Sequence, residues 1–140
     1  MSDTKQNTPV VIVAAGALYD RDSHTILMCQ RAQSGLHPSE WEFPGGKLEQ
    51  GESPESALIR ELDEELSITV EATNIRPAGF ASYDYGTRHV IIMLFIVEAW
   101  QGDMTLNEHQ AMQWVHVDAL PEFEALPADK PLLEGLVRYI

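Results

Sequence analysis

Three glutamates stand close together on one predicted helix: Glu61, Glu64 and Glu65. Spacings of three and four residues place their carboxylates on neighbouring positions of one helical surface. Like charges at such spacings oppose helix formation by about 0.2–0.5 kcal/mol per pair, and Arg60, four residues before Glu64, offsets only part of that cost. A solvated helix face is the ordinary explanation for glutamates alone. A helix that holds a hard divalent cation also needs them, because Mg²⁺ takes oxygen ligands and is usually shared with substrate phosphates.

The helix that carries these glutamates has clear signals at its start. Ser53 suits the N-cap and Pro54 suits the first helical position. Glu55 favours the positive end of the helix dipole. Apolar residues recur on one side at helical spacing: Leu58, Ile59, Leu62 and Leu66. Together these signals predict a helix over residues 54–66.

The segments around this helix predict a mixed sheet with helices packed on its faces, in the α/β (α+β) class. Residues 10–18 are rich in valine and alanine and predict a buried strand, which forms a hairpin with a strand at 26–31. Gly45 and Gly46 follow a short extended segment and allow tight backbone turns. Further strands are expected at 75–85, 88–100 and 113–117, and a final helix at 132–140.

Length and composition predict one domain at residues 9–140 behind a disordered tail at 1–8. The chain has 140 residues, 44% hydrophobic and 22% charged, which excludes disordered, collagen-like and disulfide-scaffold classes. The one cysteine, Cys29, lies in an apolar strand and cannot form an internal disulfide. No secretory signal and no stretch long enough for a membrane span are visible, so we expect a cytoplasmic protein.

The charge of the chain limits its partners. Acidic residues number 22 and basic residues 9, a net charge of −13, which repels nucleic acid polymers and anionic membranes. A small phosphorylated ligand remains compatible with this charge if divalent cations neutralise both sides. The five histidines show no zinc-ligand spacing, so they are assigned no metal. A monomer and a homodimer are both compatible with the sequence.

The spacing around the acidic helix resembles the Nudix box, G-x5-E-x7-R-E-U-x-E-E-x-G-U, in which U is aliphatic. Here the pattern runs from Gly46 through Glu52 to Arg60 and the three glutamates, and eight of nine specified positions match. A chance match in a chain of this size is roughly one in a million. Ser67 stands where the box has glycine, a residue suited to a left-handed C-cap. Either serine adopts that conformation at a cost of about 1–2 kcal/mol, or the cap is built differently; no catalytic group is lost.

The resemblance extends beyond the box and covers residues 10–140. Residues 41–47 look like the approach to the box in MutT-type members, and residues 107–109 fall where that subfamily places a further catalytic glutamate. Residues 126–131 resemble the segment that opens its last helix. The resemblance implies an α/β/α sandwich of the Nudix type with a mixed central sheet.

The activity implied by the resemblance is hydrolysis of nucleoside triphosphates, small-molecule substrates, to a monophosphate and pyrophosphate. Mg²⁺ is the implied cofactor, with Mn²⁺ as a substitute, because metal ions stabilise developing charge on phosphate oxygens and activate water. Oxidised dGTP, such as 8-oxo-dGTP, is the leading substrate. Cytidine triphosphates are the close alternative, followed by ADP-ribose and by a nucleotide-binding module without catalysis.

The family match also implies roles for the acidic residues. Glu61, Glu64 and Glu65 are expected to be metal ligands and catalytic groups, assisted by the backbone carbonyl of Gly45. Glu108 is expected to approach the same metals as a ligand or general base, with a surface glutamate as the alternative. Gly46, Glu52 and Arg60 are expected to support the site, the last two by pairing with each other.

Five further residues are candidates for binding substrate. Arg31 and Lys47 match phosphate-contacting positions, with an exposed structural role as the alternative for each. Phe43 lines a base pocket or belongs to the core, and Arg88 binds the base or solvates a turn. Asp129 stands where the oxidised-guanine enzyme reads the base with asparagine. An ionised aspartate only accepts hydrogen bonds, which suits the amino group of cytosine; a protonated one also donates, but needs a raised pKa.

Overall fold

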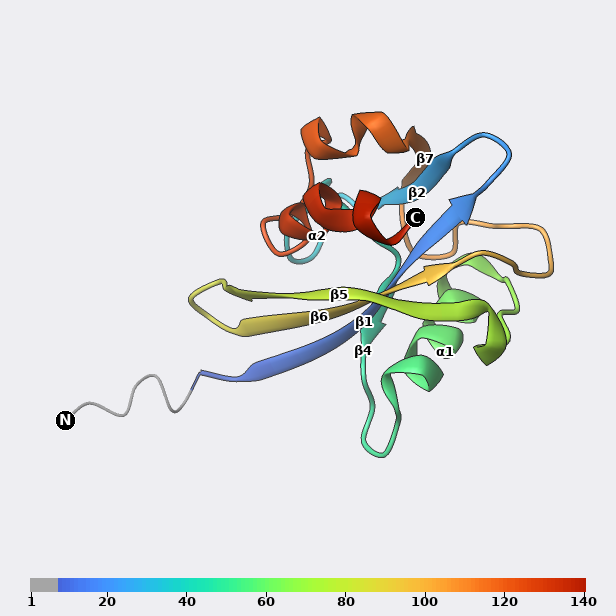
Figure 1. Cartoon of the computed structure of the whole chain (residues 1–140). Helices are drawn as coiled ribbons and strands as arrows, with labels where there is room; N and C mark the ends of the chain where they lie inside the picture. The colour runs from blue at the N-terminus through green and yellow to red at the C-terminus, as the bar shows by residue number, and fades with distance from the viewer. Residues whose placement is uncertain (1–7) are drawn as a thin grey trace.

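The computed structural model describes residues 8–140, in which seven strands form one mixed sheet (Figure 1). The predicted tail at 1–8 lies, except for its last residue, outside the described residues. The sheet order is β3-β2-β1-β6-β5, with β4 paired to β1 and β7 to β2. The strands are β1 (Val10–Asp20), β2 (Thr25–Gln30), β3 (Trp41–Glu42), β4 (Gly45–Lys47), β5 (Ile75–Asp84), β6 (His89–Val97) and β7 (Ala111–His116).

The long strand β1 organises the sheet because it has partners on both sides. It runs parallel to β6 from Val10 to Leu18, whereas every other pairing is antiparallel. The predicted hairpin with β2 is confirmed, but it pairs only at Tyr19 and Asp20. Further back along β1, the strand β4 takes the free edge beside residues 13–15. The sequence predicted only tight turns at Gly45 and Gly46, and this part of the prediction was incomplete.

The helix α1 (Pro54–Leu66) has the predicted bounds. Ser53 Oγ accepts a hydrogen bond from the backbone N–H of Ser56 at 3.1 Å, the expected N-cap contact. The predicted C-terminal helix is shorter than expected, because α2 (Lys130–Gly135) ends at a glycine and continues as a 3₁₀ turn, η4 (Leu136–Tyr139). Two further 3₁₀ turns are η2 (Ala72–Asn74) and η3 (Val117–Glu122). Among residues 8–140, no helix is long and apolar enough to cross a membrane.

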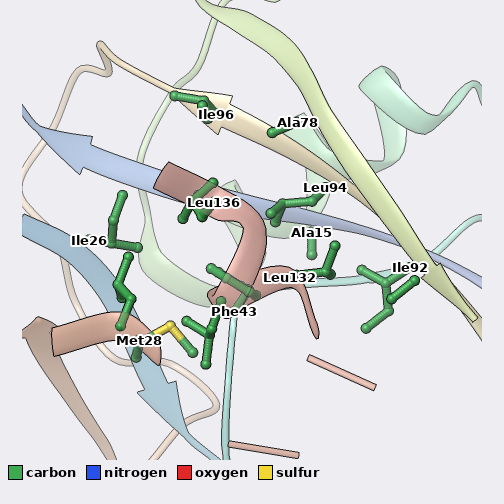
Figure 2. Packing of buried hydrophobic residues seen from close by; sticks show 14 of the residues in the cluster. Ala15, Ile26, Met28, Phe43, Ala78, Ile92, Leu94, Ile96, Leu132 and Leu136 are labelled. Carbon is green, nitrogen blue, oxygen red and sulfur yellow. The ribbon is translucent and has the colours of Figure 1, made fainter. Parts of the chain in front are cut away.

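Two apolar cores lie on opposite faces of the sheet, and Figure 1 shows α1 below strands β1, β6 and β5 and α2 above them. Successive strand residues alternate between the cores, so Ala14 and Leu18 face α1 whereas Ala15 and Ala17 face α2. Figure 2 shows Phe43 among the buried side chains on the α2 side. This mixed sheet between helices is the predicted fold class.

Candidate active site

The glycine pair of β4 lies directly against the carboxylates of α1. The backbone N–H of Gly45 donates to Glu65 Oε1 at 3.2 Å. A Cβ atom on Gly46 would lie 2.3 Å from the Glu61 carboxyl carbon. Glycine at 46 therefore allows β4 to approach the helix so closely, whereas a Cβ atom on Gly45 would collide with the backbone of Ala14 on β1. The glycines therefore have a packing role beyond the turns predicted for them.

Negative charge is concentrated between β4 and α1. Glu65 is only 4% exposed, although a glutamate is almost never fully buried unless it is paired. Burial raises the pKa of the Glu65 carboxyl well above its usual range, and the neighbouring Glu61 and Glu42 carboxyls raise it further. The N–H of Gly45 opposes this shift. Neighbouring carboxylates repel one another when all of them are ionised. A bound cation would offset this repulsion.

Arg60 ties the carboxylates of the box together. Its guanidinium donates two hydrogen bonds to Glu52, at 2.7 and 2.9 Å, as the predicted pairing requires. It also donates to Glu61 at 3.0 Å and lies 3.3 Å from Glu64. The Arg60 contact, together with the N–H of Glu49, lowers the pKa of Glu52 to about 2. Arg60 and Glu52 therefore orient the edge of the site, and neither of them lines the cavity described below.

A cavity of about 360 Å³ opens beside these carboxylates, a size within the usual range of about 300–1,000 Å³ for ligand pockets. Ten of the predicted site residues line it: Arg31, Phe43, Gly45, Gly46, Lys47, Glu61, Glu65, Arg88, Glu108 and Asp129. Glu64 does not line it, because its half-exposed side chain lies against Arg60. The structure thus brings together most of the predicted residues on one surface.

The lining of the same cavity also includes a second buried acid, Asp129. Asp129 is 4% exposed, and its Oδ2 accepts a hydrogen bond from the backbone N–H of Phe43 at 3.1 Å. Burial, and then the charge of Glu42, raise the pKa of Asp129 to about 8, against the opposing effects of the Phe43 N–H and Arg31. Phe43 itself is buried in the core and also lines the cavity, so both alternatives considered for it hold.

Two residues at the centre of the site were missed by the sequence analysis. Glu42 accepts a hydrogen bond from Arg31 at 3.0 Å and lies 2.9 Å from His109 Nε2. The other ring nitrogen of His109 is 3.8 Å from Glu65 and, within residues 8–140, is the buried side-chain atom left without a hydrogen-bond partner. The only indication in the sequence was that Glu42 and His109 stand next to Phe43 and Glu108, which were predicted to belong to the site. The network joins segments remote in sequence, which spacing cannot show.

The donor set suits a hard divalent cation. Within the described chain, no three His, Cys, Asp or Glu side chains converge closely enough to hold a metal alone. Glu61 and Glu65 nevertheless present adjacent carboxyls within hydrogen-bonding reach. Mg²⁺ is commonly bound through one or two carboxylates, with water and substrate phosphates completing its octahedron. Of the three predicted glutamates of α1, Glu61 and Glu65 are the two that line the cavity and could hold such an ion there.

Comparison with known proteins supports this fold class and identifies a family. The NUDIX domain model matches residues 10–136. The 8-oxo-dGTP diphosphatase of Escherichia coli K12 is 32% identical over 126 residues, covering 90% of this chain and 95% of that protein. The CTP pyrophosphohydrolase of the same organism is 35% identical over 127 residues, covering 91% and 92%. The crystal structure of the MutT protein from Methanosarcina mazei Go1 superposes with a TM-score of 0.82 at 25% identity, covering 95% and 96%.

Together, the mixed sheet between helices and the carboxylate-lined cavity define an α+β protein with an acidic candidate site. The chain belongs to the Nudix family and is a Nudix hydrolase. The resemblance deduced from the box spacing is thereby confirmed.

Proposed function

We propose that this chain hydrolyses nucleoside triphosphates to a monophosphate and pyrophosphate in the presence of Mg²⁺ or Mn²⁺. The coarser activity, that of a Nudix nucleotide pyrophosphohydrolase, follows from the family and from relatives named 8-oxo-dGTP diphosphatase and CTP pyrophosphohydrolase. The single observation that carries the finer proposal is that one cavity is lined both by the carboxylates of α1 and by the buried Asp129. We assign Glu61 and Glu65 to a phosphate wall and Asp129, with the Phe43 N–H, to a base wall.

On the phosphate wall, Glu61, Glu64 and Glu65 are the proposed ligands, with the carbonyl of Gly45. Mg²⁺ would supply charge stabilisation at the phosphate oxygens. Arg60 holds Glu61 and Glu64 in place through its ion pairs. Glu108 is proposed to accept the proton of the attacking water, because its side chain lines the cavity from a different loop.

The remaining cations on the cavity wall are proposed to orient the substrate. Lys47 stands next to the glycine pair on β4, and Arg31 is held by Glu42. Both line the cavity and are proposed to contact phosphate oxygens. Arg88 lies in the β5–β6 turn, where its carbonyl accepts a hydrogen bond from the N–H of Tyr85, and it is proposed to contact the nucleoside. These contacts would fix the triphosphate in one direction across the cavity.

On the base wall, the protonation state of Asp129 is proposed to determine which nucleotide bases the site can recognise. With a pKa of about 8, the carboxyl is protonated at neutral pH, so it can both donate and accept like the amide of asparagine. A neutral carboxyl matches the adjacent carbonyl and N–H groups of an oxidised guanine. Oxidised dGTP is therefore the leading substrate that we propose. Its hydrolysis would remove oxidised nucleotides before they are used in DNA synthesis. Cytidine triphosphates remain the alternative, because an ionised Asp129 would accept from the cytosine amino group.

This assignment predicts a pH-dependent substrate ranking. As pH rises through about 8, Asp129 loses its proton and its donor, so kcat/KM for 8-oxo-dGTP should fall relative to that for CTP. One base-reading pair is worth about 1–3 kcal/mol, which corresponds to roughly 5- to 150-fold. The groups that face Asp129 are Glu42, Arg31 and Tyr85, and the first two act on its pKa in opposite directions.

The control for this prediction is Asp129→Asn. Asparagine keeps a donor and an acceptor but cannot ionise. Any change with pH that remains in the ratio of kcat/KM for 8-oxo-dGTP to that for CTP would then come from ionisation of the nucleotides. We expect the variant to favour 8-oxo-dGTP at every pH. Equal pH trends in the wild-type protein and in Asp129→Asn would mean that the base is read elsewhere.

The function itself is tested by a panel of normal and oxidised nucleoside triphosphates, together with ADP-ribose. Each is incubated with the protein and Mg²⁺, and the products are separated as monophosphate, pyrophosphate and inorganic phosphate. We expect monophosphate and pyrophosphate in equal amounts from triphosphates. Cleavage of ADP-ribose alone, or release of inorganic phosphate from the triphosphates, would overturn the proposal.

A further inference from the structure

The end of α1 is capped by the loop that carries Glu108. The last four carbonyls of a helix have no partner within it. Here each has one: the Ser67 N–H donates to Asp63 O, the Asn107 side chain to Glu64 O, the Asn107 N–H to Glu65 O and the Thr105 N–H to Leu66 O, at 2.9–3.0 Å. Three of these four donors belong to residues 105–107. The loop is therefore attached to the same helix turn that holds Glu64 and Glu65.

Ser67 completes this attachment in a conformation that serine rarely adopts. Its backbone is left-handed, with φ 59° and ψ 35°, where glycine is usual. Its hydroxyl oxygen lies 2.9 Å from both Thr105 Oγ1 and the Asn107 side-chain amide, which donates to it. Glycine at this position would keep the backbone cap without strain but would lose both contacts. Serine at this position therefore has a strained backbone but gains two hydrogen bonds to the loop.

The loop is also fixed on the other side of Glu108. His109 has a buried side chain, which contacts Glu42 on β3 at 2.9 Å. Asn107 is fixed to α1 and His109 to β3, so the backbone of Glu108 is held at both neighbours. The Glu108 side chain is exposed and lies on the wall of the cavity.

We infer that Ser67 and Asn107 are positioning residues that hold Glu108 against the carboxylates of α1. The inference rests on the proposed function in one respect, namely that Glu108 acts on the reacting atoms. Ser67 and Asn107 touch neither substrate nor metal in this scheme. Their effect passes through the backbone of the loop, so it should appear in turnover and in loop dynamics rather than in substrate affinity.

The test variant is Ser67→Gly, because a stability role and a positioning role predict different results for it. Glycine relieves the left-handed strain, so the midpoint of thermal unfolding should stay the same or rise. Loss of the hydroxyl contacts should nevertheless lower kcat roughly tenfold with KM unchanged, since a small misplacement of a reacting group is costly. Ser67→Ala, which keeps the strain, should show the same loss of kcat with a lower midpoint. Unchanged kcat in Ser67→Gly would overturn the inference.

A second measurement needs neither metal nor substrate. Amide hydrogen exchange of the metal-free protein should show faster exchange at the Asn107 N–H in Ser67→Gly, with the interior of α1 unchanged. Unchanged protection at Asn107 would also overturn the inference.

Glu108→Gln separates this inference from the proposed function. If Glu108→Gln lowers kcat, then adding Ser67→Gly should cause no further loss, and an additive loss would show that Ser67 acts elsewhere. If Glu108→Gln leaves kcat unchanged, the catalytic role proposed for Glu108 fails and the positioning role fails with it. A loss in Glu108→Gln without a loss in Ser67→Gly overturns the positioning role alone.

Discussion

Glu65→Gln should lower kcat about 10²- to 10³-fold while the protein stays folded. Glutamine keeps the shape of the buried side chain and can still accept the hydrogen bond from Gly45, but it removes a ligand charge worth several kcal/mol in the transition state. Each 1.36 kcal/mol corresponds to about tenfold in rate. The measurement is kcat on the best triphosphate of the panel, with the circular dichroism spectrum and thermal midpoint recorded beside it.

The same helix supplies a matched control. Asp63→Asn removes the same charge from the same turn of the helix, but the Asp63 side chain is exposed, so kcat should stay within about twofold. Glu64→Gln is a sharper test of the metal-ligand role that the family resemblance implies for Glu64, because this side chain lies against Arg60 and outside the cavity. We expect a loss of orders of magnitude there too. A Glu64→Gln variant as active as Asp63→Asn would remove Glu64 from the mechanism.

The adjacent glycines of β4 should respond differently to alanine. At Gly45, with φ 149°, a Cβ atom would lie 2.2 Å from the backbone oxygen of Ala14, so Gly45→Ala should cost about 3 kcal/mol of unfolding free energy through overpacking and strain. At Gly46, a Cβ atom would meet the end of the Glu61 side chain, which can move. Gly46→Ala should therefore fold but lose about tenfold or more in kcat, because Glu61 is displaced.

Urea unfolding and kcat separate these outcomes. Gly51→Ala is the control for strain, because φ at Gly51 is 84° and no atom lies within 4 Å of the added Cβ. Gly45→Ala no less stable than Gly51→Ala would contradict the close packing of β4 on β1. A fully active Gly46→Ala would contradict the placement of Glu61 at the site.

The sequence predicted the elements whose signals are local. The bounds of α1 were predicted because the N-cap, the proline and the apolar stripe all lie within the helix itself. The strand β4 was not predicted, since its existence depends on the free edge of β1, some 30 residues earlier in the chain. Of the two possibilities left open at Ser67, the structure shows the left-handed cap, and the loop that contacts it is remote in sequence.

The candidate site shows the same division between local and remote information. Helical spacing placed three glutamates on one surface, but a helix advances about 100° per residue. Glu61 and Glu65 are therefore only about 40° apart around the axis, whereas Glu64 and Glu65 are about 100° apart, and only the first pair lines the cavity. Glu42 and His109 were missed because their contacts join β3 to the loop after Glu108. The single domain at 9–140 and the catalytic roles stay predictions.

The central claim is that the carboxylates of α1 and the glycine pair of β4 hold divalent ions against the phosphates of a nucleotide. Its most direct test is a crystal of the protein with Mn²⁺ and a non-hydrolysable nucleoside triphosphate, examined by anomalous scattering. The account predicts manganese peaks beside the carboxylates of Glu61 and Glu65, with the triphosphate bound to the same ions. A bound nucleotide with manganese elsewhere, or with none at these carboxylates, would contradict it.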